Sequence, residues 1–202
     1  MFKVLFFAIL ILPHLINAEP RLRPDDWGKP LIGSKLTNLY KVDKELYRSE
    51  QPEHENVINL KSIGIKEVLN LREFHSDEDD LKEGRFGLHR IKMNAGEVTE
   101  EQLVESLRII MNRKGPVIVH CWHGSDRTGV VIAAYRIIFN NWSKAKAIDE
   151  MVNGGFGHHS GVYPNLVPLI ENLNVERIKK SLGLTVGITK TESSYNELIF
   201  VS

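Results

Sequence analysis

The 202-residue sequence contains a single cysteine, Cys121, and no excess of charge of either sign. One cysteine excludes a disulfide within the chain, so the fold depends on a packed core. Lysine and arginine together number 26, as do aspartate and glutamate, so the formal net charge is zero. This balance gives no indication of nucleic-acid binding or of binding to a charged lipid surface. Internal repeats and low-complexity tracts are also lacking.

Apolar runs long enough to cross a membrane are lacking as well. The run at residues 4 to 12 is shorter than the roughly 20 residues that a spanning helix needs. It follows Lys3 and precedes Pro13 and the small Ala18, a pattern typical of a secretory signal. We expect a signal peptide at residues 1 to 18 and no stable membrane insertion after its removal. The remaining residues suffice for one domain with a substantial core.

The most informative stretch, residues 117 to 131, reads VIVHCWHGSDRTGVV. A β-branched run, Val117 to Val119, leads into a loop with a glycine, and the loop opens into an apolar run with helical spacing. Cys121 is therefore placed where a strand passes into a helix. Backbone N–H groups at a helix start lack partners within the helix, and those of a tight loop form a concave nest. This stretch therefore predicts an anion-binding site.

Two side chains of this stretch have the chemistry to act on a phosphate. A cysteine at a helix N-terminus near cationic groups can have a pKa of roughly 3.5 to 7.5, which makes it a strong nucleophile at neutral pH. We therefore expect Cys121 to react as a thiolate. Arg127 can bind two phosphate oxygens with its forked guanidinium while charge develops on them. Gly124 allows the loop to turn tightly without a Cβ atom.

Residues 120 to 129, HCWHGSDRTG, resemble the H-C-x5-R-[ST] signature of the cysteine-dependent protein tyrosine and dual-specificity phosphatases. The resemblance implies that Cys121 forms a phosphocysteine intermediate and that Arg127 binds the phosphate. It also implies that Thr128 assists formation of the thiolate and breakdown of the intermediate, and that His120 orients the loop. The main chain of five residues would form the phosphate cradle: Trp122, His123, Gly124, Ser125 and Asp126.

Two further segments, LYRSEQP at residues 46 to 52 and GGFG at residues 154 to 157, are similar to a branch of small exported bacterial phosphatases. The likeness spans about residues 36 to 182. Together with the expected signal peptide, it implies export, to the periplasm of a bacterium.

The chain divides into a short leader, one domain and a tail. We expect an irregular leader at residues 19 to 35, anchored by Trp27, a phosphatase domain at residues 36 to 183, and a tail at residues 184 to 202 that lacks a firm pattern and is typical of disorder. The domain should be a three-layer α/β/α structure with a mainly parallel central sheet. The pattern predicts strands at residues 36–40, 45–48, 65–71, 88–93 and 117–119, and helices that begin near residues 51, 99, 126, 143 and 165.

The general acid is less clear from the sequence. These phosphatases usually place an aspartate upstream of the cysteine to protonate the leaving oxygen, but the corresponding loop here, residues 94 to 98, contains none. Glu97 lies in that loop and has suitable chemistry. Asp126 lies inside the cradle, and Asp-Arg-Thr at this place resembles the loop of the myotubularin lipid phosphatases. We favour Asp126 slightly, although it could instead hold the loop by accepting hydrogen bonds.

Two other clusters could suggest a metal, but neither has the pattern of a metal site. The acidic residues 76 to 80 lack the alternating spacing of a calcium loop, so we interpret them as a solvated loop. His158 and His159 lack an adequate ligand set for zinc, and we expect them either in a flexible wall of the active-site mouth or on plain surface. Arg72 should emerge on the same rim as Cys121, where a solvated surface position is the simpler interpretation. We expect no metal and no cofactor.

The sequence thus predicts a phosphomonoester hydrolase, a protein tyrosine or dual-specificity phosphatase, whose partner is a phosphorylated protein or a small phosphate ester. A phosphoinositide or inositol phosphate phosphatase is the alternative within enzymes, although the cradle has no lysine. A phosphate-binding module with weak or no turnover is the alternative of another class. Sulfur transfer by a rhodanese-like domain is disfavoured by the Arg-Thr-Gly that follows the loop. We expect a monomer.

Overall fold

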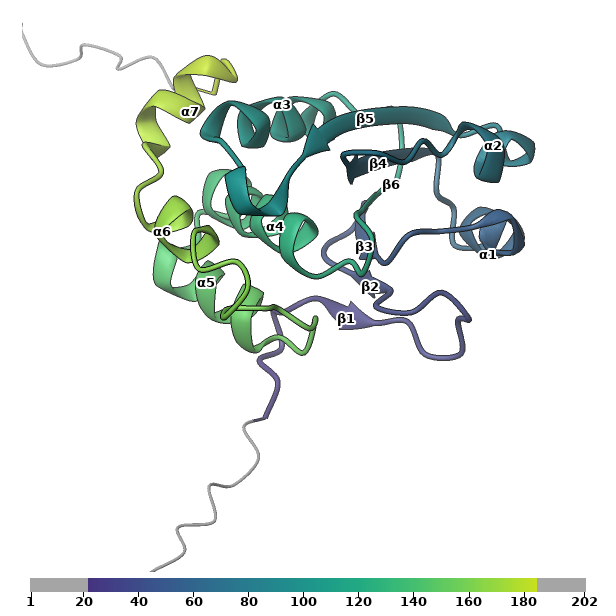
Figure 1. The fold of residues 1–202 in the computed structure, drawn as a ribbon, viewed down its shortest axis with the longest axis horizontal. Helices are drawn as coiled ribbons and strands as arrows, with labels where there is room; N and C mark the ends of the chain where they lie inside the picture. Colours follow the sequence, from purple (N-terminus) through teal and green to yellow (C-terminus); the bar gives the residue numbers. More distant parts are fainter. Residues whose placement is uncertain (1–21, 185–202) are drawn as a thin grey trace, which may run out of the picture.

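A six-stranded sheet forms the centre of the computed structural model, which describes residues 22 to 184 (Figure 1). The expected signal peptide and nearly all of the expected tail lie outside these residues. Strand order is β1-β2-β3-β6-β4-β5, with β3, β6, β4 and β5 parallel and β1 and β2 antiparallel at one edge. The strands are β1 (Lys29–Pro30), β2 (Tyr40–Lys41), β3 (Leu46–Ser49), β4 (Glu67–Arg72), β5 (Gly87–Met93) and β6 (Val117–His120). The mainly parallel sheet is confirmed.

Helices cover both faces of this sheet, which makes three layers (Figure 1). One face carries α3 (Glu100–Met111), α4 (Asp126–Phe139), α5 (Lys144–Asn153), α6 (Leu166–Glu171) and α7 (Val175–Ser181), and the other carries α1 (Val57–Ser62) and α2 (Glu78–Leu81). Three single 3-10 turns are η1 (His54–Asn56), η2 (Lys82–Gly84) and η3 (Ala95–Glu97). Among the residues described, no helix is both long and apolar enough to cross a membrane.

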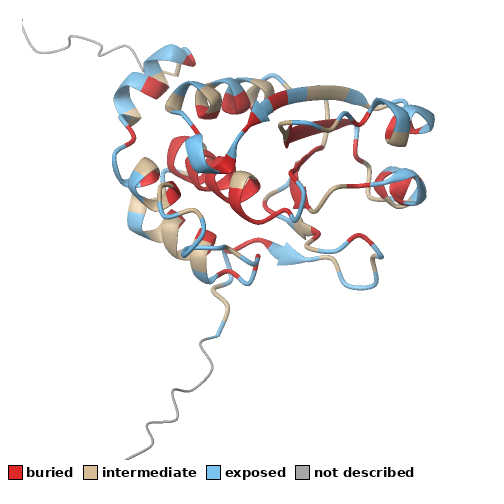
Figure 2. Ribbon diagram, in the orientation of Figure 1, coloured by how far each residue is buried: buried red, intermediate tan, exposed pale blue. Residues whose placement is uncertain are grey.

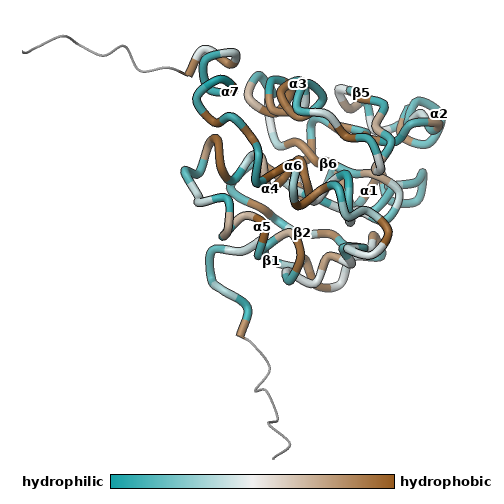
Figure 3. The backbone as a smooth tube through the Cα atoms, turned by 60° about the vertical axis from the view of Figure 1, so that its left-hand side comes forward, coloured by the Kyte–Doolittle hydropathy of each residue, from teal (hydrophilic) through white to brown (hydrophobic). Residues whose placement is uncertain are grey.

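The core follows the alternation of side chains along the parallel strands. On β4, Leu69 and Leu71 pack in the cluster beneath α3 and α4, whereas Val68 packs in the cluster beneath α1. α4 is apolar on nearly all sides, and every residue from Thr128 to Ile138 is buried (Figure 2). The hydrophobic stretches of the chain lie towards the inside of the molecule (Figure 3). A central α4 therefore fixes the loop that precedes it.

Caps and turns set several boundaries as the sequence predicts. Thr99 and Gln102 form a capping box at the start of α3, and Ser143 caps α5 by accepting a hydrogen bond from the amide of Lys146. The helix expected from residue 165 is two helices instead, because the extended backbone of Asn174 ends the run and its side chain caps α7.

Three expectations for the first half of the domain need correction. Only Tyr40 of the strand expected at residues 36 to 40 is in a strand, because turns occupy the preceding residues. The leader is not wholly irregular, since it supplies β1, and Trp27 is buried as expected. The acidic loop at residues 76 to 80 is not fully solvated: it begins α2 and buries Asp77.

The leader is attached to the domain through a buried charge pair. Arg136 donates from Nε to Glu150 Oε2 (2.8 Å) and from Nη2 to Glu150 Oε1 (2.9 Å), and both side chains are buried. The amide of Gly28 donates to the same carboxylate at 2.7 Å. Glu150 therefore joins α4, α5 and the leader.

Candidate functional site

The passage from strand to helix around Cys121 is present as expected. β6 ends at His120 and α4 begins at Asp126, so the loop between them carries Cys121 at the carboxyl end of a central parallel strand. Cys121 and Arg127 line one pocket of about 260 Å³. The loop itself, η3 and the segment between α5 and α6 provide the rest of the lining: Ala95, Trp122, His123, Asp126, His159, Val162 and Tyr163.

Every carbonyl oxygen from Cys121 to Ser125 accepts a hydrogen bond; the first four bonds come from groups outside α4, and that to Ser125 comes from the first turn of α4. The pairs are His120 Nδ1 with Cys121 O (3.1 Å), the Gln51 amide with Trp122 O (2.9 Å), Asn38 Nδ2 with His123 O (2.8 Å), Arg48 Nη2 with Gly124 O (2.6 Å) and the Gly129 amide with Ser125 O (2.7 Å). Within residues 22 to 184, the amides of residues 122 to 125 have no hydrogen-bond partner. The loop can therefore offer these N–H groups to an anion.

Gly124 is essential to this shape. Its φ angle is +70°, in the left-handed region that favours glycine. A Cβ atom there would lie 2.3 Å from the backbone oxygen of Ser49, at the end of β3. The tight turn expected at Gly124 is confirmed, and the reason is the close approach of β3.

Arg48 supports the loop from the side of β3, a role that nothing in the sequence predicts beyond the resemblance of residues 46 to 52. Its side chain is buried, and its guanidinium lies over the Phe156 ring at 3.6 Å while donating to Gly124 O. Burial lowers the pKa of Arg48 to about 10, so the side chain is still charged at neutral pH. A fixed positive charge therefore lies directly behind the cradle.

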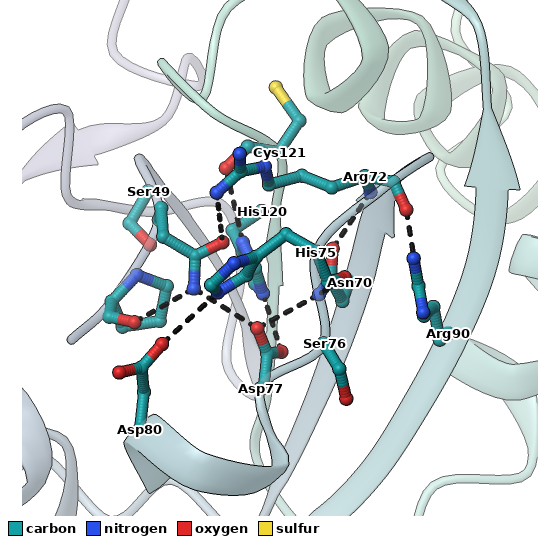
Figure 4. A network of polar contacts seen from close by, with 12 residues as sticks. Ser49, Asn70, Arg72, His75, Ser76, Asp77, Asp80, Arg90, His120 and Cys121 are labelled. Atoms are coloured by element: carbon teal, nitrogen blue, oxygen red, sulfur yellow. Dashed lines mark hydrogen bonds and ion pairs between the residues drawn. The ribbon is translucent and has the colours of Figure 1, made fainter. Parts of the chain in front are cut away.

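A second buried charge lies behind Cys121 (Figure 4). His120 is fully buried, and its Nε2 is 2.8 Å from Asp77 Oδ2 while its Nδ1 is 3.1 Å from the backbone oxygen of Cys121. Carboxylate and carbonyl oxygens only accept hydrogen bonds, so both contacts form together when both ring nitrogens carry protons. Gln51 and Asn70 donate to Asp77 Oδ1 at 3.0 and 2.8 Å. The interpretation of residues 76 to 80 as a solvated loop missed this carboxylate.

Arg127 and Thr128, at the start of α4, have polar atoms that few partners occupy. Within the described residues, the only hydrogen bond of the Arg127 guanidinium is a 3.3 Å contact from Nη1 to Met93 O, which leaves most of its donors free. Thr128 Oγ1 is buried and has no partner in residues 22 to 184.

Arg72 is not simply a solvated surface residue. Its guanidinium stacks on the exposed Trp122 ring at 4.6 Å (Figure 4 shows its approach to Cys121). Burial and then the charge of Arg127 lower the pKa of Arg72. Two guanidinium groups thus lie close together at the cradle.

The two possible acids lie in different surroundings. Asp126 is buried, lines the pocket and accepts hydrogen bonds from the amide and the ring of His159. Glu97 is exposed at the end of η3 and is not part of the pocket lining, although Ala95 of the same turn is. Among the residues described, no group of three or more His, Cys, Asp or Glu side chains is arranged to hold a metal.

Comparison with known proteins defines the class to which this site belongs. The model of the tyrosine phosphatase family matches residues 35 to 194, so the chain belongs to the tyrosine phosphatase family. The dual specificity protein phosphatase TpbA of Pseudomonas aeruginosa is 36% identical over 124 residues, which cover 59% of this chain and 56% of that protein. The match thus spans little more than half of the relative's length.

One further relative and two solved structures are also similar to this chain. The inositol diphosphatase DSP5 of Arabidopsis thaliana is 27% identical over 135 residues, covering 62% of this chain and 65% of that protein. The crystal structure of P. aeruginosa TpbA superimposes with a TM-score of 0.72 at 28% identity, covering 80% of this chain and 99% of that one. A TpbA structure in complex with phosphotyrosine gives the same TM-score at 27% identity, with the same coverage of each chain.

Replacement of Gly124 by alanine should abolish anion binding by the cradle. The new Cβ atom cannot coexist with the Ser49 oxygen 2.3 Å away, so the loop must move and its N–H groups diverge. Binding of inorganic phosphate, measured by calorimetry, should fall below detection. Gly64→Ala is the matched control, because Gly64 also has a positive φ but nothing lies within 4 Å of its Cβ position. It should cost about 1 kcal/mol of stability without loss of binding. Equal binding by both variants would contradict the assignment.

Replacement of Asp77 by asparagine should destabilise the fold at neutral pH but not in acid. Burial raises the pKa of Asp77, but the hydrogen bond and charge of His120 outweigh burial and leave that pKa below its ordinary value. The stabilisation is therefore complete above the unfolded pKa of about 3.9 and is lost as the pH falls through the lower folded pKa. Urea unfolding at pH 7 should show a loss of about 3 kcal/mol.

The difference between Asp77→Asn and the wild type should shrink steadily as the pH falls from about 4, because the carboxyl group is protonated first in the unfolded state and then, at lower pH, in the folded state. Asp79→Asn is the control from the same acidic segment, because Asp79 is exposed, and its unfolding curve should match the wild type at each pH. A loss for Asp77→Asn that is independent of pH would exclude the ion pair with His120.

Proposed function

We propose that the chain is a phosphomonoester hydrolase of the protein tyrosine or dual-specificity type, with Cys121 as nucleophile. One observation carries this proposal. All five loop carbonyls from Cys121 to Ser125 accept hydrogen bonds, so the N–H groups of the loop and the Arg127 guanidinium remain available for a phosphate. Membership of the tyrosine phosphatase family supports it.

The proposed reaction has two in-line transfers. The Cys121 thiolate attacks phosphorus, the sulfur–phosphorus bond forms and the ester oxygen leaves. Water then attacks the phosphocysteine, which releases phosphate and restores the thiolate. Arg127 and the amides of the cradle, from Trp122 to Asp126, bind the equatorial oxygens on which charge develops. Thr128 Oγ1, buried and without a partner in the described part of the chain, is available to stabilise the thiolate.

Phosphotyrosine, on a protein or as a small ester, is the substrate class that we propose first. Trp122, Val162 and Tyr163 line the pocket together with Cys121, and Trp122 and Val162 are exposed. Such a lining favours the ring of an aryl phosphate. The phosphotyrosine complex of TpbA supports this choice.

An inositol phosphate or diphosphate is the second substrate class. It is favoured by the pair of guanidinium groups, Arg72 and Arg127, which could bind more than one phosphate group, and by the relatives named as inositol diphosphatases. A higher kcat/KM for an inositol diphosphate than for a phosphotyrosine peptide would select it.

The enzyme activity is tested with p-nitrophenyl phosphate and a phosphotyrosine peptide in reducing buffer. Cys121→Ser should abolish turnover and should retain the peptide that the wild type consumes. Arg127→Lys should lower kcat by about 10²-fold, because the forked contact to the phosphate is lost. Arg108→Lys, on the exposed face of α3, is the control and should match the wild type. A folded wild type that binds phosphate without turnover would instead favour the binding module.

Export to a bacterial periplasm, as a monomer, is the proposed setting. It is supported by the charged and then apolar pattern of residues 1 to 18, which ends at Ala18. Expression of the full chain in a bacterium should give a periplasmic protein whose N-terminal residue, by mass spectrometry, is Glu19. A product that retains residues 1 to 18 in the cytoplasm would contradict this proposal.

A further inference from the structure

The segment that closes the pocket carries a histidine that the reaction described so far does not use. His159 lines the pocket with Cys121 and Arg127, and 46% of its side chain is exposed. Its amide donates to Asp126 Oδ1 at 2.9 Å, and its ring Nδ1 is 2.8 Å from Asp126 Oδ2. Its carbonyl accepts the amides of residues 162 and 163, both at 2.9 Å. The histidine is therefore fixed through its ring and through its backbone.

The contact with Asp126 determines what the rest of the ring can do. An ionised carboxylate only accepts hydrogen bonds, so the Nδ1 of His159 carries a proton and Nε2 is the nitrogen left for a substrate. A carboxylate bound to Nδ1 also orients the ring, as in other aspartate–histidine pairs that transfer protons. Histidine is well suited to this task because it titrates near neutral pH.

We propose that His159, held by Asp126, is the general acid of the phosphatase reaction; this inference rests on the proposed function. When the thiolate of Cys121 attacks, the sulfur–phosphorus bond forms, the ester bond breaks and the leaving oxygen takes the proton from His159 Nε2. In the second transfer, the same nitrogen accepts a proton from the attacking water, the sulfur–phosphorus bond breaks and phosphate leaves. The imidazolium and the thiolate are then both restored.

The other side chains that could donate the proton, Asp126, Glu97 and His123, are less suited to this role. Both oxygens of Asp126 already accept hydrogen bonds from His159, and Glu97 is not part of the pocket lining. The ring of His123 has no hydrogen-bond partner within the described residues that would orient it. The loop upstream of Cys121, residues 94 to 98, contains no aspartate. His159, on the segment between α5 and α6, would donate the proton that such an aspartate usually supplies.

The charged and titratable neighbours of His159 come from its own segment and from the rest of the pocket lining. His158 lies on the far side of Asp126, with Nδ1 3.2 Å from Oδ1 and only 1% of its side chain exposed. Burial lowers the pKa of His158, so this neighbour is neutral at pH 7 and adds no positive charge beside Asp126. Among the described residues, the titratable groups that line the same pocket as His159 are Cys121, His123, Asp126, Arg127 and Tyr163.

The test compares two leaving groups across pH for the full chain and its variants. Phenolate leaves poorly without a proton, whereas p-nitrophenolate leaves readily. His159→Gln should therefore lower kcat for phenyl phosphate by about 10²-fold and kcat for p-nitrophenyl phosphate far less. It should also remove the alkaline fall in the phenyl phosphate profile. Asp126→Asn should keep that fall, because the histidine is still present, but should lower kcat for phenyl phosphate, because the ring loses the carboxylate that orients it.

The matched control is His89→Gln, because His89 also pairs with a carboxylate, Glu67, at 2.9 Å but lies outside the pocket lining. Its two profiles should match the wild type. The proposal is overturned if His159→Gln loses the same factor on both substrates or keeps the alkaline fall, or if Asp126→Asn or Glu97→Gln removes that fall instead. Failure of the phosphatase function itself gives a different result, since the wild type would then turn over neither ester.

Discussion

The proposed phosphate site depends on one constraint: the five carbonyl groups of residues 121 to 125 are all held by hydrogen bonds. Each of these oxygens accepts a hydrogen bond, so the backbone of the loop is held in one shape even at the exposed residues Trp122 and His123. Three donors, Asn38, Arg48 and Gln51, come from the chain around β3, which pairs in parallel with β6. The anion-binding amides are therefore produced by packing between segments that are about 75 residues apart.

Buried charges make this scaffold specific as well as stable. Arg48 and the Asp77–His120 pair are removed from water, which is costly unless each group is fully paired. Arg48 donates to the Gly124 oxygen and His120 contacts the Cys121 oxygen, whereas Asp77 is paired with the side chains of His120, Gln51 and Asn70, so both charged groups are linked to the shape of the loop. A cradle of this kind is ordered before a phosphate arrives, and binding does not have to supply the free energy of ordering it.

The pocket mouth combines two parts of the chain with different tasks. The loop and α4 supply the nucleophile and the guanidinium, whereas the segment between α5 and α6 supplies one wall and the aspartate–histidine contact. Hydrogen bonds from Ser125 Oγ and Asn38 Nδ2 to Phe156 O join that segment to the cradle. A proton donor on this wall would be fixed relative to the bound phosphate without any upstream aspartate.

The sequence by itself determined the nature of the site and the class of fold. A strand, a glycine-containing loop and a helix start are local features, and Cys121, Gly124 and Arg127 are close together in the chain, so their spacing predicts their geometry. The capping box at Thr99 and the buried character of α4 were likewise predictable from short-range patterns.

Only the tertiary structure decided which distant residues complete the site. Asp77 belongs to an acidic run that resembles a solvated loop, and it is buried because Asn70 and Gln51 bind it against His120. His159 gains its partner because the segment after α5 folds back over Asp126. Side-chain contacts between residues far apart in the chain leave no periodic signal in one sequence, since they depend on the packing of the whole sheet and its helices.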